Sequence, residues 1–230
     1  MHPWILGVAL VAAGEAALGA GSNAAQTASA SCPAATAAVF ERFIDASCDT
    51  CWTDASVEHA GARQWLLDWI VPSARGDDAP LSPAAPAESA ARAQRVSSGP
   101  LPDGRTTVLR TPARTASTLR VRVVSGPAWS GYFAVQVNGS GRVAAGATAW
   151  IALVETVAPG ADGSVVPRQL VRTVAGPFEP AELRSGKPWQ LLQAMRWPET
   201  AKPVRLRARA WVEQHDGRIV AMAADRCDDR

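Results

Sequence analysis

The sequence predicts an α+β protein with an α/β N-terminal third and an antiparallel β-sheet or sandwich in the C-terminal half. In the first third, two apolar runs of strand length alternate with helix-favouring segments. From about residue 119 onward, short runs alternate apolar and polar residues with a period of two, and turn signals separate them. Apolar residues make up 47% of the chain, enough for a substantial core.

The first third predicts the order strand, helix, strand, helix. The first strand contains β-branched and aromatic residues, and a C-x-x-C motif follows it. Gly61 ends the first helix, and Pro83 lies at the start of the second. The expected strands span residues 39–44 and 64–71, and the expected helices span 52–60 and 84–96.

A linker or loop is expected over residues 97–118, which are rich in Gly, Pro, Ser and Thr. The strands beyond it are expected at residues 119–124, 132–137, 147–155, 166–174, 189–195, 204–212 and 218–223. Asn138-Gly139 and Asp216-Gly217 are typical hairpin turn signals. Many short strands joined by turns favour antiparallel pairing.

The N-terminus predicts export. An apolar run over residues 4–13 is too short to span a membrane, and Ala28-Ser29-Ala30 fits a signal-peptidase cleavage pattern. A buried N-terminal helix and a lipoprotein signal ahead of Cys32 are the alternatives. We therefore expect a periplasmic or secreted protein with no membrane anchor after cleavage. Its regions are a signal peptide (1–30), an N-terminal domain (31–112) and a β domain (113–230).

Four cysteines agree with an oxidising compartment. Cys32 and Cys227 flank the folded region without a local partner, and because chain ends often lie close together we expect them to form a structural disulfide. The net charge of +2 gives no case for nucleic acid binding.

Cys48 and Cys51 are the candidate chemical site. A strand, a turn, C-x-x-C and a helix place the first thiol where backbone N–H groups favour the thiolate, the form that attacks disulfides. Cys48 would be the nucleophile and Cys51 the resolving thiol, with thiols or disulfides of other proteins as partners. Asp49 opposes a strong thiolate. The alternative is a static disulfide in a non-catalytic envelope binding or structural module.

Residues 41–51, Glu-Arg-Phe-Ile-Asp-Ala-Ser-Cys-Asp-Thr-Cys, resemble the motif of a family of secreted bacterial thioredoxin-like proteins of poorly defined function. Trp52 departs from that motif, which usually has Pro there. The resemblance implies a reduced thioredoxin-like N-terminal region and a β-rich C-terminal part. It also implies a cis-proline opposite the cysteines, for which Pro112 is the candidate.

Other residues carry weaker hypotheses. Glu41 and Asp68 are candidate proton acceptors for Cys51, although solvated carboxylates are the simpler interpretation. The alternating arginines at 120 and 122 and at 205, 207 and 209 form either a basic binding face or ordinary solvated strand faces.

The nine tryptophans permit a carbohydrate-binding interpretation, but those in strand-like runs are most simply core. We expect Trp52 and Trp129 to be partly exposed. The histidines have no neighbouring ligands at metal-site spacing, so no metal or cofactor is expected.

Overall fold

The computed structural model describes residues 38–56, 64–96, 106–112, 118–143, 145–179 and 186–225. Within them the α-helices are α1 (Asp49–Thr53) and α2 (Ser89–Val96). The strands are β1 (Ala38–Asp45), β2 (Gln64–Val71), β3 (Thr106–Pro112), β4 (Arg120–Trp129), β5 (Tyr132–Ser140), β6 (Thr148–Val157), β7 (Arg168–Phe178), β8 (Trp189–Arg196), β9 (Leu206–Glu213) and β10 (Ile219–Ala224). No helix of this described part is long and apolar enough to cross a membrane.

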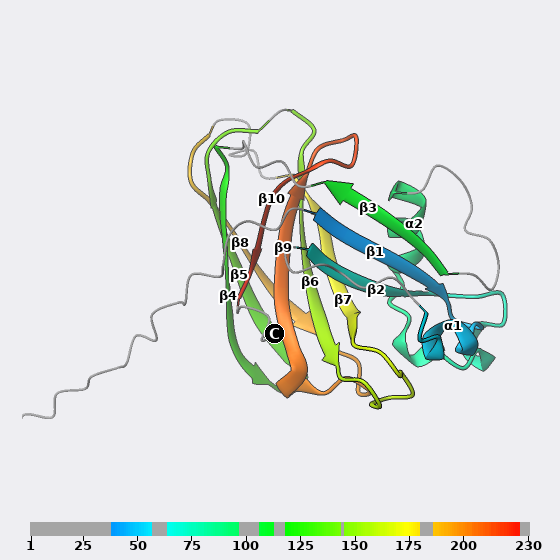
Figure 1. Ribbon diagram of the computed structural model, residues 1–230. Coiled ribbons are helices and arrows are strands. Elements are labelled where there is room, and N and C mark those ends of the chain that lie inside the picture. Colours follow the sequence, from blue (N-terminus) through cyan, green and yellow to red (C-terminus); the bar gives the residue numbers. More distant parts are fainter. Residues whose placement is uncertain are drawn as a thin grey trace, which may run out of the picture. The chain divides into compact units, whose positions relative to one another are not determined.

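The strands form two sheets. The larger has the order β10-β9-β6-β7-β2-β1-β3, and the smaller is the antiparallel sheet β4-β5-β8. The larger sheet is mixed, because β1 pairs with β2 and β2 with β7 in parallel, whereas its other pairs are antiparallel. Strands from both halves of the sequence therefore share one sheet (Figure 1).

The larger sheet bends sharply between β2 and β7. Asp68 and Leu170 are the Cα partners recorded between these two strands, whereas β1 and β2 stay in register along their whole length. Figure 1 shows β1, β2 and β3 running across the direction of β6 and β9. The bend lets β1 and β2 fold over one face of β6 and β9.

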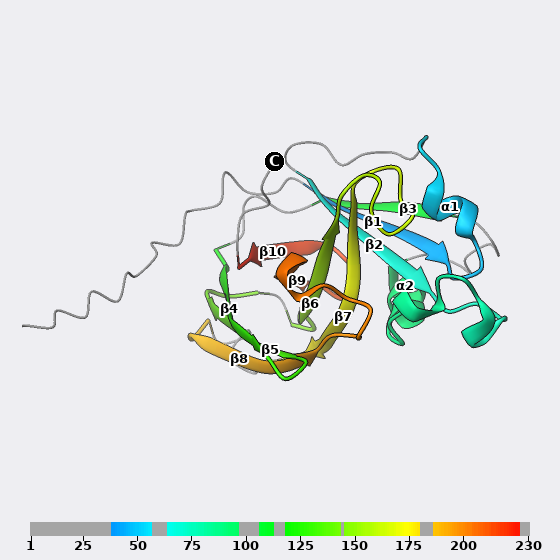
Figure 2. The ribbon, with the colours of Figure 1, turned by 90° about the horizontal axis from the view of Figure 1, so that it is seen from below.

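This bend makes β6 and β9 the centre of two hydrophobic layers. On one face, Ile151 and Leu153 pack toward the three-stranded sheet. On the other face, Trp150 and Trp211 pack with Trp69 and other side chains of the first third. Strand β6 is consequently buried on both faces. Figure 2 shows the three-stranded sheet and α2 on opposite sides of β6 and β9.

Arg92 holds α2 against the second layer. Its guanidinium donates to both carboxylate oxygens of Glu41 at 2.8 Å, and to Glu213 at 2.7 and 2.9 Å. It also lies 5.5 Å from the ring centroid of Trp150 and 5.3 Å from that of Trp211. All three charged side chains are almost fully buried, so the docking of α2 depends on this fully hydrogen-bonded ionic group.

The predicted α+β fold with a thioredoxin-like N-terminal region is wrong. The described chain is mostly β-sheet, and its helices are short. The parallel neighbour of β2 on the side away from β1 is β7, a strand from the C-terminal half. The local order of strand, helix, strand and helix was compatible with an α/β unit, but long-range pairing placed these strands in the mixed sheet.

Several local predictions are also corrected. Residues 97–118, expected as a linker, contain β3, which pairs antiparallel with β1. The first helix ends at Thr53 and does not continue through residues 54–56. The second helix begins only at Ser89, because Pro86 disfavours the helical conformation of the residue before it, and Ala85 is extended.

The hairpin turn expected at Asn138-Gly139 is wrong, because both residues lie inside β5. The two-residue turn of this sheet is Ser130-Gly131, which joins β4 to β5. Both turn residues have positive φ, 47° and 83°, as the two-residue turns of twisted hairpins require. The indole of Trp189 explains the glycine at 139, because a Cβ added there would lie 2.1 Å from that ring. The turn expected at Asp216-Gly217 is confirmed.

Candidate functional site

The cysteine pair lies just beyond the C-terminal end of β1. Asp45 ends the strand, and its carboxylate accepts hydrogen bonds from the backbone N–H of Ser47, at 2.8 Å, and from the Ser47 hydroxyl. The N–H of Cys48 donates to the carbonyl of Asp45 at 2.9 Å. Asp and Ser favour such side-chain-stabilised turns, so this short segment directs the chain from the strand into α1.

Cys48 and Cys51 form a disulfide, with Cα atoms 5.3 Å apart, within the range for such a bond. Cys48 is buried at 8% exposure, whereas Cys51 is half-buried. The sequence hypothesis assigned Cys48 as the attacking thiol, yet reactive cysteines are usually the accessible ones. Exposure therefore favours Cys51 as the sulfur that a reductant reaches first.

Trp52 attaches this loop to the rest of the protein. Its indole is buried, in contrast to the partial exposure expected from sequence, and packs with Ile44 and Ile70 of β1 and β2. The indole N–H donates to the carbonyl of Asp162 at 2.8 Å. The residue after the C-x-x-C motif is therefore a core residue that connects α1 to the β6–β7 loop.

Arg168, at the start of β7, holds the loop from the other side. Its side chain is fully buried and donates to the carbonyls of Cys51 at 3.2 Å and Trp52 at 2.5 Å. Its Cζ lies 4.9 Å from the Trp52 ring centroid, and its Nε donates to the hydroxyl of Ser164 at 3.0 Å. These contacts fix the backbone of α1 on the strand that follows the β6–β7 loop.

Asp68 completes the buried ionic group beneath the cysteine loop. Arg42, its cross-strand partner on β1, forms an ion pair with it, and the backbone N–H of Gln169 donates to it at 2.8 Å. Arg168 lies 3.6 Å from the same carboxylate. Burial raises the pKa of Asp68, which Arg42 opposes. Burial, together with the charge of Arg42, lowers the pKa of Arg168.

The two carboxylates proposed as proton acceptors for Cys51 differ in position. Asp68 lies on the side of the cysteine loop, but its connection to Cys51 runs through Arg168, which lies 3.6 Å from the Asp68 carboxylate and donates to the Cys51 carbonyl. Glu41 pairs with Arg92 in the layer under α2, among the neighbours of Val39 and Phe43. Both carboxylates are fully buried, so the interpretation of solvated side chains is wrong. Their burial was not visible in sequence, because it depends on arginines from distant segments.

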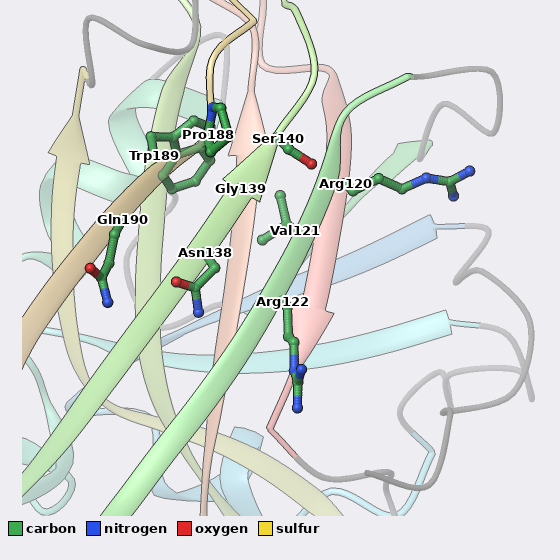
Figure 3. A pocket seen from close by; sticks show the side chains of 9 residues that line it. All are labelled: Arg120, Val121, Arg122, Asn138, Gly139, Ser140, Pro188, Trp189 and Gln190. Carbon is green, nitrogen blue, oxygen red and sulfur yellow. The ribbon is translucent and has the colours of Figure 1, made fainter. Parts of the chain in front are cut away.

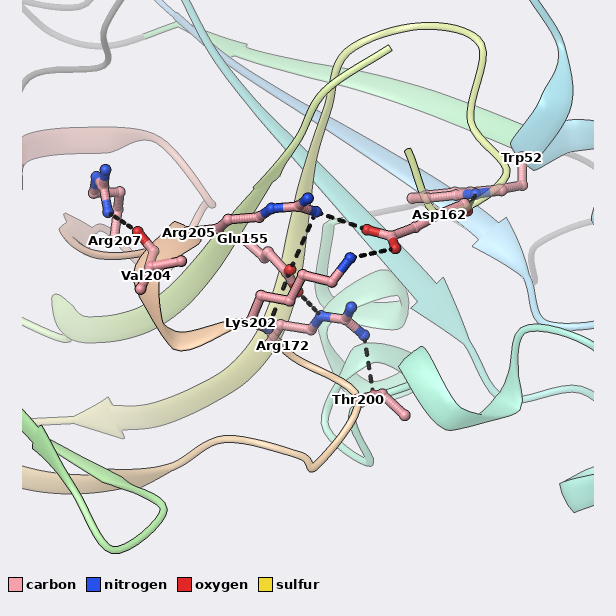
Figure 4. Close-up of polar contacts among 9 residues, drawn as sticks. All are labelled: Trp52, Glu155, Asp162, Arg172, Thr200, Lys202, Val204, Arg205 and Arg207. Carbon is pink, nitrogen blue, oxygen red and sulfur yellow. Dashed lines mark hydrogen bonds and ion pairs between the residues drawn. The ribbon is translucent and has the colours of Figure 1, made fainter. Parts of the chain in front are cut away.

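A second ionic cluster surrounds Asp162, at the tip of the β6–β7 loop. Its carboxylate accepts from Lys202 and Arg205, each at 2.9 Å (Figure 4). The hydrogen bond from Lys202 is the main cause that lowers the pKa of Asp162. Because the Asp162 carbonyl also accepts from Trp52, this loop joins α1 to the segment before β9.

The remaining predicted site residues do not join the cysteine pair. Pro112 lies opposite Ala38 in the β1–β3 ladder, at the end of β1 remote from Cys48. Cys32 and Cys227 lie outside the described residues, so their disulfide stays a prediction.

For Arg209, both interpretations of the arginines at 205, 207 and 209, a basic binding face and a solvated strand face, are wrong, because this side chain is fully buried. Its guanidinium lies 5.1 Å from the Trp65 ring centroid and donates to the carbonyl of Leu66 at 3.0 Å.

The sheet β4-β5-β8 presents a second candidate site. Alternation along each strand sends one set of side chains into the core and the other set outward. We call the outward set the outer face. It consists of Arg120, Arg122, Val124, Trp129, Tyr132, Ala134, Gln136, Asn138, Ser140, Gln190, Leu192, Ala194 and Arg196. The predicted exposure of Trp129 is confirmed.

One end of the outer face carries a shallow open pocket of about 520 Å³. Figure 3 shows Asn138 and Gln190 on neighbouring strands, with Arg120 and Arg122 projecting from β4. Sequence analysis noted the alternating arginines, but the amides and the aliphatic residues of the outer face gave no signal, because only the strand register brings them together.

No protein-family model and no curated protein sequence matches the chain. Among solved structures, the chain is similar to HBP35 of Porphyromonas gingivalis, with a TM-score of 0.53 and 10% sequence identity. The match covers 85% of this chain and 76% of that chain. The likeness establishes a shared fold with a bacterial protein.

Proposed function

We propose that the chain is an exported bacterial envelope protein that binds a partner, and that its Cys48–Cys51 disulfide is a static brace. The observation that carries the static brace is the anchoring of the cysteine loop. Cys48 is buried, and Arg168 holds the carbonyls of Cys51 and Trp52. Thiol–disulfide exchange requires an accessible sulfur and a loop that admits a mixed disulfide, which this packing opposes.

Export is proposed from the apolar N-terminal run and Ala28-Ser29-Ala30. The disulfide is consistent with it, because such bonds persist mainly in oxidising compartments. N-terminal sequencing of protein purified from its own host should find the chain starting near Ser31. Recovery of Met1 on the folded protein would overturn export.

The brace is tested by removing it. The double variant Cys48→Ala/Cys51→Ala should fold and lose about 2 kcal/mol of unfolding free energy, the chain-entropy value for so short a loop. Chemical denaturation in the absence of reductant measures this loss. In the wild type, dithiothreitol should reduce the disulfide only at the rate of local opening. If the wild-type protein reduces insulin disulfides catalytically, the proposal of a static brace is wrong.

Thiol–disulfide exchange is the second candidate, favoured by the partial exposure of Cys51 and by the exposed neighbours Asp49 and Thr50. It predicts that the pair equilibrates with a glutathione buffer while the protein stays folded. Mass spectrometry of alkylated samples would report the equilibrium. A mixed disulfide trapped at Cys51 in a Cys48→Ala variant would favour this candidate over the brace.

A further inference from the structure

We propose that the outer face of the β4-β5-β8 sheet binds an acidic segment of a partner protein, one that carries apolar side chains among its carboxylates. This inference rests on the proposed function as a binding module. It does not depend on the chemistry of the cysteines, which lie beyond the end of β1, a strand of the other sheet.

Exposed apolar side chains concentrate on this face. Trp129 is 79% exposed, Leu192 68%, Tyr132 45% and Val124 42%. The described residues contain two other large apolar side chains of comparable exposure, and neither lies in this sheet. Scattered exposed apolar residues are normal, but a concentration on one surface marks an interaction site.

The strand register arranges these residues in cross-strand rows. Trp129, Tyr132 and Arg196 form one row, because Tyr132 is the Cα partner of both other residues. Val124 and Leu192 flank Gln136 in a second row. Trp, Tyr and Arg are the residue types that contribute most to binding energy at protein interfaces. The outer face therefore has the composition of an interface centre with charge around it.

The charge of this face selects the partner. None of the three strands contains Asp or Glu, whereas Arg120, Arg122 and Arg196 all lie on the outer face. A second copy of the chain would oppose the same cations, which disfavours self-association. A carboxylate-bearing partner complements them, and guanidinium groups form strong paired hydrogen bonds with carboxylates.

The pocket at the Arg-rich end extends this complementarity. Asn138 and Gln190 are Cα partners, so their amides lie beside each other and next to Arg122 (Figure 3). Side-chain amides both donate and accept hydrogen bonds, as extended peptide backbone requires. The aliphatic row of Val124 and Leu192 favours a peptide over a charged polysaccharide, because burying these side chains needs apolar partner surface.

The test uses the full mature protein against a phage-displayed library of random linear peptides. We expect the enriched peptides to combine several Asp or Glu residues with aromatic or aliphatic residues. Synthetic copies should bind with an affinity that falls as salt rises. The double variant Arg120→Glu/Arg122→Glu and the single variant Leu192→Asp should each weaken binding about tenfold or more.

Matched controls separate the outer face from general charge effects. Arg75→Glu and Val204→Asp also place a carboxylate at exposed positions, but outside the three strands, and both should leave peptide affinity unchanged. The proposal would be overturned if the library yields no binding peptides, or if the enriched peptides carry no excess of Asp and Glu. It would also be overturned if the control variants lose as much peptide affinity as the outer-face variants.

Two further outcomes would also overturn it: tighter binding of a uronic acid oligosaccharide than of any peptide, and concentration-dependent dimerisation blocked by Leu192→Asp. The double variant Cys48→Ala/Cys51→Ala should bind the same peptides. Normal peptide binding by a protein that also proves redox-active would refute the static brace while leaving the outer face as proposed.

Discussion

The guanidinium of Arg168 lies over the Trp52 ring, with its Cζ 4.9 Å from the indole centroid, and the same guanidinium donates to the Trp52 carbonyl. One side chain thus holds both the ring and the backbone of the residue that follows the disulfide. The contact joins the cysteine loop of the N-terminal third to β7 of the C-terminal half, and three of the predictions below test buried or ionic contacts of this long-range kind.

Arg168→Lys should loosen the cysteine loop. Lysine keeps the charge but has no planar group to stack on Trp52 while donating to two carbonyls. We expect a loss of about 2–3 kcal/mol in chemical denaturation, since buried hydrogen-bonded groups lose their partners. Reduction of the disulfide by dithiothreitol should also accelerate. Arg75→Lys, at an exposed turn, is the control and should change neither quantity.

Arg92→Met should destabilise the protein by about 3–5 kcal/mol, because it leaves the buried carboxylates of Glu41 and Glu213 without a counter-charge. Thermal and chemical unfolding measure the loss. Arg95→Met is the matched control on α2, since Arg95 is exposed although its guanidinium also lies 5.3 Å from the Trp150 ring. It should cost less than about 1 kcal/mol. Equal losses would show that charge compensation is unimportant there.

Asp162→Asn should reveal a pH-dependent contribution of the Asp162 cluster. The pKa of Asp162 is lowered in the folded protein, so its stabilising effect is present above the unfolded value of about 4 and is lost as the pH falls through the folded pKa. At neutral pH the unfolding free energy of the wild type should exceed that of the variant by less than about 1 kcal/mol, because the cluster is partly exposed. The difference should vanish in acid.

Denaturation of the two proteins across a pH series gives this difference directly. Asp77→Asn, at an exposed carboxylate of the turn before α2, is the control and should leave the unfolding free energy nearly unchanged. A difference that persists or grows in acid would assign the effect to packing rather than to charge.

Gly139→Ala should disrupt the three-stranded sheet, because the new Cβ would lie 2.1 Å from the buried Trp189 ring. Displacing that ring should cost about 1–3 kcal/mol or more and quench or shift tryptophan fluorescence. Gly126→Ala is the control in the same sheet, where the added Cβ would meet Ala134 at an ordinary 3.6 Å. If both variants unfold at the same denaturant concentration, the Gly139–Trp189 contact is not tight.

Sequence patterns located most strands but not their partners. The apolar run at 64–71 is β2 with the same bounds, and the alternating runs near β4 and β9 are strands. β3 escaped prediction because its Thr and Arg residues lie among loop-like neighbours. It becomes a strand through its pairing with β1, a long-range contact that local propensity does not contain.

The sequence by itself determined where apolar and polar residues alternate, where β1 ends and the C-x-x-C motif follows, and which turn joins β9 to β10. Only the tertiary structure decided that β7 lies beside β2, that Trp52 and Arg209 are buried, and that the arginines of β4 share a face with Leu192. The physical reason is that periodicity fixes which side chains share a face of one strand, whereas burial depends on the strand or loop packed against that face. For Trp52 those partners are Asp162 and Arg168, more than a hundred residues along the chain.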